Sequence, residues 1–186
     1  MDGEEVGKII LDIRQKLMLR MNGAAAAAMR DHGIVYKLNY GVTVPEIKSI
    51  ASQYPRDCKL AQQLWCQECR ECRMLAAMLY PASAFLSDMA DVWIDSIEYS
   101  DLADVCCKYL FQYMPQASVT AFRWIACDEP IRQYCGFMIM AHLLRAGNVL
   151  RDTYLCELRD QATAAMASDL VLPRQAAAVV SGIIDD

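Results

Sequence analysis

The sequence has little of what several common protein classes require. Its 186 residues hold no apolar run that approaches the ~18–20 residues of a bilayer-spanning helix, so we expect no contact with a membrane. The chain begins Met-Asp-Gly-Glu-Glu, which is acidic and lacks the basic and apolar regions of a signal peptide. We therefore expect a cytoplasmic protein.

Basic residues are also scarce for a protein that binds nucleic acid. The chain has 18 Lys and Arg against 23 Asp and Glu, which gives a net charge of −5. A protein that holds duplex DNA generally gains affinity by neutralising phosphates with Lys and Arg. The overall charge therefore argues against strong nonspecific DNA binding, although one basic face can exist within an acidic total.

Metal-binding patterns are weak in this sequence. The nine cysteines are odd in number, which argues against a complete disulfide framework, and histidine occurs only twice. Cys66, Cys69 and Cys72 form C-x-x-C-x-x-C, but no Gly or Pro lies between them. A second C-x-x-C or a pair of histidines does not follow, so neither an iron–sulfur cluster nor zinc is favoured. We expect the three to form a buried stripe on a helix, with no metal and no cofactor.

Helical periodicity, in contrast, is present along the whole chain. Apolar residues recur with a period near 3.6 from Val6 to Met21, and no segment shows the sustained alternation of a strand. Similar patterns between Gly and Pro breakers predict further helices near 24–29, 45–54, 56–64, 68–79, 83–97, 100–114, 117–126, 130–144, 149–166 and 173–186. We predict an all-α fold in one domain, residues 1–186, built as a single α-solenoid of HEAT-like helical pairs.

Two carboxylates, Asp101 and Asp104, lie three residues apart where the helix near 100–114 begins. In one interpretation Ser100 or Asp101 caps this helix and Asp104 interacts with the helix dipole in the first turn. In the other, one carboxylate faces a cationic centre on a substrate. Spacing alone favours the capping interpretation.

Aromatic and histidine side chains give no independent indication of a site. Trp65, Trp93 and Trp124 follow the apolar periods, so we expect them in the core, although aromatics on a groove can also stack on bases. His32 and His142 stand apart from each other and from other potential ligands, so a structural role is expected for both.

Several short motifs occur in a characteristic order. Val44-Pro-Glu-Ile-Lys-Ser-Ile-Ala51 comes first, and Leu60-Ala-Gln-Gln-Leu-Trp65 follows with Glu71 and Arg73 behind it. Trp93-Ile-Asp-Ser-Ile97 then precedes Ser100-Asp-Leu-Ala-Asp104. In this order, over most of the chain, the motifs resemble those of the DNA alkylation repair (AlkD-like) family of HEAT-like repeat DNA glycosylases.

The resemblance implies a fold, a partner and a site. Members of the family are curved α-solenoids that cradle duplex DNA, and active members excise cationic alkylated purines without a metal. Asp104 corresponds to the carboxylate that stabilises the oxocarbenium-like sugar by electrostatics. The candidates for DNA contacts are Asp101, Arg70, Arg73, Arg123, Arg132 and Tyr134. The ordinary interpretation of these arginines is a solvated helix face or an ion pair.

Departures from the family pattern leave two functions open. Ser100 stands where the family has a tryptophan against the damaged nucleotide, and Val179 stands where it has a second one. Stacking contributes ~1–3 kcal/mol per base, so losing both contacts could remove lesion binding. The chain is expected to be either an alkylpurine DNA glycosylase or a noncatalytic HEAT-like scaffold that binds a protein or a nucleic-acid structure.

Overall fold

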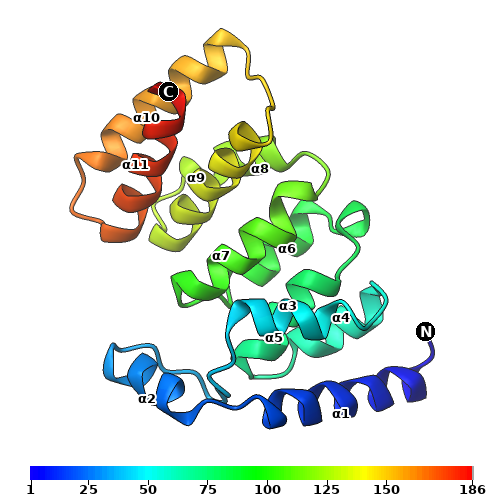
Figure 1. Ribbon diagram of the computed structural model, residues 1–186. Coiled ribbons are helices and arrows are strands. Elements are labelled where there is room, and N and C mark those ends of the chain that lie inside the picture. Colours follow the sequence, from blue (N-terminus) through cyan, green and yellow to red (C-terminus); the bar gives the residue numbers. More distant parts are fainter. Residues whose placement is uncertain (186) are drawn as a thin grey trace. The chain divides into compact units, whose positions relative to one another are not determined.

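The computed structural model describes residues 1–185, and every regular element among them is helical (Figure 1). The α-helices are α1 (Gly3–Leu19), α2 (Gly23–Asp31), α3 (Val44–Ala51), α4 (Cys58–Trp65), α5 (Arg70–Leu79), α6 (Ser87–Ile94), α7 (Ser100–Tyr109), α8 (Ala117–Ile125), α9 (Pro130–Arg145), α10 (Asp152–Met166) and α11 (Val171–Asp185). Short 3-10 helices, η1 (Ala82–Ala84) and η2 (Phe111–Tyr113), complete the set. The prediction of an all-α fold is confirmed.

Contacts divide the chain into two compact units, Met1–Ala84 and the residues from Phe85 onward. Each unit has its own core and is described by itself. The expectation of one domain over residues 1–186 stays a prediction.

In the first unit α3 and α4 pack on α5, and α1 packs on α3 and α4. Its helix starts follow the sequence closely. The Thr43 amide and hydroxyl donate to the Glu46 carboxylate at 3.1 and 2.7 Å, at the start of α3. Asp57 caps α4 by accepting from the Leu60 amide at 2.9 Å. The predicted starts of these two helices are therefore confirmed.

A buried carboxylate joins a loop to the first unit. Glu71 on α5 is fully buried and accepts hydrogen bonds from the amides of Tyr40 and Val42 at 3.1 and 3.2 Å. Its third donor is the guanidinium of Arg70, at 3.2 Å, which also donates to the Val42 carbonyl at 3.1 Å. The ion pair thus satisfies the polar backbone of the loop before α3.

The second unit is built on α9, which contacts α7, α8 and α11, while α10 packs on α11. Gly136 permits the close approach of α8 and α9, because a Cβ atom there would lie 2.7 Å from the Ala121 carbonyl oxygen. Phe111 and Trp124 pack edge to face in the core, with ring centroids 5.4 Å apart. Trp65, Trp93 and Trp124 are all buried, so their prediction as core residues is confirmed.

Two local predictions were wrong. One helix was predicted near 83–97, but the structure has η1 at Ala82–Ala84 and begins α6 only at Ser87, with Asp91 inside α6. The three cysteines do not form one buried helical stripe, because the chain turns between α4 and α5. Cys66 ends α4 and is exposed, whereas Cys69 and Cys72 are buried at the start of α5. Over residues 1–185, no group of three or more His, Cys, Asp or Glu side chains is placed to hold a metal ion.

None of the described helices is both long enough and apolar enough to cross a membrane.

Candidate functional site

The two carboxylates at the start of α7 do not cap it. The N-cap residue is Tyr99, and no side chain makes a capping hydrogen bond there. Helix α7 begins at Ser100, so Asp104 lies beyond the first turn. The capping interpretation, which spacing alone favoured, was wrong for both Asp101 and Asp104.

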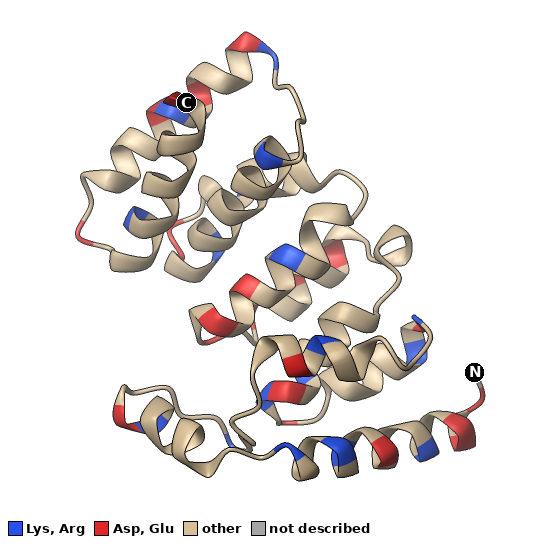
Figure 2. Ribbon diagram, viewed as in Figure 1, with Lys and Arg blue, Asp and Glu red and all other residues tan. Residues whose placement is uncertain are grey.

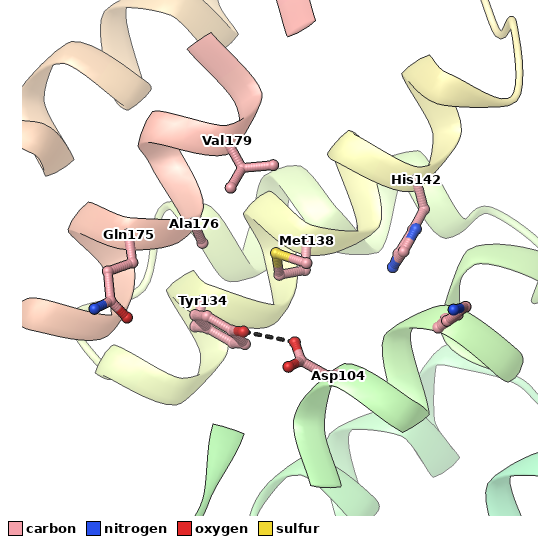
Figure 3. Close-up of a pocket in the computed structure, with 8 residues that line it drawn as sticks. Asp104, Tyr134, Met138, His142, Gln175, Ala176 and Val179 are labelled. Atoms are coloured by element: carbon pink, nitrogen blue, oxygen red, sulfur yellow. Dashed lines mark hydrogen bonds between the residues drawn. The ribbon is translucent and has the colours of Figure 1, made fainter. Parts of the chain in front are cut away.

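Asp104 is oriented instead toward α9. The Tyr134 hydroxyl donates to the Asp104 Oδ1 atom at 2.5 Å, and Figure 3 shows the two side chains pointing toward each other across the helices. Tyr134 is only 8% exposed, whereas Asp104 is accessible to solvent. A buried phenol therefore fixes one oxygen of an accessible carboxylate and leaves the other open.

A pocket of about 350 Å³ surrounds this pair. Three helices, α7, α9 and α11, contribute its lining (Figure 3). The lining residues are Asp104, Lys108, Tyr134, Met138, His142, Gln175, Ala176 and Val179. Ligand pockets typically enclose ~300–1,000 Å³, so this one is suited to a small organic group.

The electrostatics of the pair follow from its partial burial. Desolvation raises the pKa of Asp104, and the charge of Asp101 adds to this effect, while the hydrogen bond from Tyr134 opposes it. Burial and the adjacent carboxylate also raise the pKa of Tyr134. Both shifts favour the protonated form of the group concerned, so the phenol keeps the proton that it donates to Asp104.

Two residues of the pocket, Lys108 and His142, were not singled out as site residues from the sequence. Burial, followed by the positive charges of Arg145 and Lys108, lowers the pKa of His142. A spacing signal was present, because Lys108 follows Asp104 by one helical turn and His142 follows Tyr134 by two. That signal became useful only once Asp104 and Tyr134 were known to face each other.

Of the other candidates in the first unit, Arg70 is 7% exposed and is held by Glu71 and the Val42 carbonyl. Arg73 is half-buried, and its guanidinium lies over the Trp65 ring, 5.6 Å from the centroid. Burial gives Arg70 a structural role, so we leave it out of the proposed DNA contacts.

The candidates in the second unit, Arg123 and Arg132, both pair with Asp91 on α6, at 2.7 and 3.0 Å. Asp91 also accepts from the Trp124 indole at 2.7 Å, and Arg132 pairs further with Asp95 and Glu129. This network ties α6, α8 and α9 together. Among the described residues that line the Asp104 pocket there is no arginine, so the structure brings Asp104 and Tyr134 together without the four arginines.

Comparison with known families decides what kind of protein this is. The model of the family described as DNA alkylation repair enzyme matches residues 13–170. The chain belongs to this family. Among solved structures, it is similar to a protein described as one of "a new family of proteins related to the HEAT-like repeat DNA glycosylases with affinity for branched DNA structures". The TM-score is 0.83 at 17% identity, covering 93% of this chain and 74% of the other.

This similarity confirms the prediction of a HEAT-like helical-repeat fold. No curated protein sequence matches the chain significantly.

The structure also places the two positions where the sequence resemblance suggested a family tryptophan. Val179 is half-exposed and lines the pocket beside Asp104 (Figure 3). Ser100 is half-exposed at the start of α7. The space that an aromatic ring would take at position 179 is therefore part of an open pocket.

Proposed function

We propose that this member of the DNA alkylation repair family binds duplex DNA and hydrolyses the N-glycosidic bond of cationic N-alkylated purines. The observation that carries the proposal is the Asp104 carboxylate, held at 2.5 Å by the buried Tyr134 hydroxyl at the edge of a pocket of about 350 Å³. A fixed anion in a partly desolvated site is suited to a reaction in which positive charge develops on the substrate.

The reaction needs little from the protein. A purine alkylated at N3 or N7 already carries a positive charge, so it leaves with the electrons of the glycosidic bond as a neutral base. Positive charge then develops at C1′ and the ring oxygen of the deoxyribose. The Asp104 carboxylate stabilises this charge, and a water molecule adds to C1′ and loses a proton to solvent or to the carboxylate. Tyr134 holds the carboxylate in place and does not touch the reacting atoms.

Base release from N-methylated duplex DNA tests the proposal. Replacing Asp104→Asn keeps the shape of the side chain and removes its charge, so we expect release to fall by about 10²–10³-fold, as for loss of one preorganised electrostatic group. Tyr134→Phe should give a smaller loss, because the carboxylate remains. Asp160→Asn, an exposed carboxylate on α10, is the control. Absence of release by the native protein, or equal release by Asp104→Asn, would remove Asp104 from catalysis.

A second function, binding of a DNA structure without chemistry, is favoured by the residues at positions 100 and 179. Ser100 and Val179 offer no aromatic surface to a damaged base. The similar solved protein is described as having affinity for branched DNA. Fluorescence anisotropy with a four-way junction and a matched duplex separates the two functions. Tighter binding of the junction, combined with no base release, would support the binding function.

A further inference from the structure

The Asp104 pocket has charges of both signs near it. Asp104 is the acidic residue of the lining, and Asp101 lies one turn earlier on α7. Lys108 and His142 lie in the same lining, and Arg145 follows His142 by three residues on α9. Figure 2 shows the same order of signs along α7, with two acidic positions followed by a basic one.

Neither Lys108 nor Arg145 is held by an acidic side chain. Both are exposed, and neither forms a salt bridge with a residue in the described part of the chain. The Lys108 ammonium lies over the adjacent Tyr109 ring, 5.6 Å from its centroid. Three of the other arginines of the second unit are paired, namely Arg123, Arg132 and Arg159. Lys108 in the pocket lining and Arg145 near His142 thus keep their charges available for an anion.

Helix dipoles explain only part of this arrangement. Lys108 lies in the last turn of α7 and Arg145 in the last turn of α9, where a positive charge is favourable. The dipoles do not explain why charges from two separate helices converge on a half-buried histidine. Burial and these two charges lower the pKa of His142, which favours the neutral imidazole, and a neutral imidazole still offers one N–H donor.

We propose that Lys108 and Arg145, with His142 as a neutral donor, bind the backbone phosphate that flanks the nucleotide facing Asp104. This inference rests on the DNA-binding part of the proposed function and not on its chemistry. A nucleotide with a cationic base or sugar and an anionic phosphate matches a pocket with the opposite arrangement of charges. In this arrangement Asp104 faces the base or sugar of the nucleotide, and Lys108 and Arg145 contact the flanking phosphate.

Salt dependence of DNA binding tests the contact. Binding of a fluorescent duplex that carries a tetrahydrofuran abasic site is measured by anisotropy over a range of salt concentrations. Each lost phosphate contact lowers the slope of log K against log salt by about 0.9. We expect that reduction for Lys108→Gln and for Arg145→Gln. Arg151→Gln should leave the slope unchanged, because this exposed arginine does not line the pocket and, unlike Arg145, is not among the charges that lower the pKa of His142.

A single neutral methylphosphonate linkage next to the abasic site locates the phosphate. When the linkage replaces the phosphate that Lys108 contacts, on one side of the abasic site, it should weaken binding by the native protein. The same linkage should have little further effect on binding by Lys108→Gln, because that variant already lacks the lysine charge. Competition by inorganic phosphate at millimolar concentration distinguishes a site for any phosphate from one that needs the DNA strand. We expect no competition, since the strand supplies the other contacts.

The outcomes separate this inference from the proposed reaction. Reduced slopes in Lys108→Gln and Arg145→Gln support the phosphate contact whether or not the native protein releases bases. Unchanged slopes, or an equal reduction in Arg151→Gln, overturn the contact even if base release is observed. Circular dichroism of each variant shows whether any loss of binding comes from loss of fold.

Discussion

The two units use carboxylates in opposite ways. Glu71 in the first unit is fully buried and accepts from two backbone amides and one guanidinium. Asp104 in the second unit is accessible, and over residues 1–185 its hydrogen-bonding partner is the Tyr134 hydroxyl. Glu71 is committed to the fold, whereas Asp104 keeps an oxygen free for a ligand. A carboxylate with spare acceptor capacity at a pocket is the better functional candidate.

The distribution of charge differs as well. Residues 1–84 carry eleven basic and nine acidic side chains, whereas residues 85–186 carry seven basic and fourteen acidic ones. Figure 2 shows both signs along α1, in the first unit. The acidic total of the chain therefore comes from the unit that holds the candidate site. Attraction of DNA to that unit depends on a few well-placed cations, which is why Lys108 and Arg145 are tested separately.

The largest effect is expected from removing the carboxylate that the fold uses. Glu71→Ala removes the buried carboxylate that accepts from the Arg70 guanidinium and two backbone amides, which costs about 3–5 kcal/mol of unfolding free energy. Glu68→Ala breaks an exposed ion pair with Lys37 and should cost at most about 1 kcal/mol. Urea unfolding followed by circular dichroism gives both values. Similar costs for the two variants would contradict the structural role of Glu71.

A gain of binding is expected from restoring an aromatic side chain at the pocket. Val179→Trp places a stacking surface beside Asp104, and stacking contributes ~1–3 kcal/mol per base. Binding of N-methylated duplex should therefore tighten by about fivefold or more. Val149→Trp is the matched control, because Val149 is 95% exposed and lies outside the pocket lining. An equal gain in both variants would show that the added apolar surface, and not the pocket, is responsible.

The helices could be predicted from sequence because local physical chemistry determines them. The Thr43–Glu46 pair and the Asp57 cap depend on residues three apart, so the starts of α3 and α4 could be predicted from the sequence. The candidate role of Asp104 as a site carboxylate was suggested only by the resemblance to the family. Its spacing from Asp101 favoured a cap, and the structure shows no capping side chain there.

Long-range pairing explains what the sequence did not reveal. Arg70 and Arg132 read as surface cations, yet their partners Val42 and Asp91 are 28 and 41 residues away. The hydrogen bond between Asp104 and Tyr134 spans 30 residues and depends on the packing of α7 on α9. The pocket that contains Lys108 and His142 depends on that same packing and on α11. A pattern of neighbouring residues cannot reveal contacts between residues that lie so far apart in the sequence.

The smallest expected effect is the change in unfolding free energy when Asp104, the accessible carboxylate, is replaced. Because the pKa of Asp104 is raised in the folded state, the folded protein binds this proton more tightly than the unfolded chain does. The stabilisation is present at low pH and is lost as the pH rises through the folded pKa. Asp104→Asn should therefore be as stable as the native protein at neutral pH, or more stable by about 0.5 kcal/mol, a difference typical of accessible positions.

This difference should shrink below the pKa of the carboxyl group, where the native side chain is also neutral. Thermal unfolding at pH 7 and pH 4 measures it, with Asp160→Asn as the control on α10. A clear loss of stability in Asp104→Asn at neutral pH would show that the fold uses this carboxylate as it uses Glu71. The contrast between the two units, and with it the assignment of Asp104 to function, would then fail.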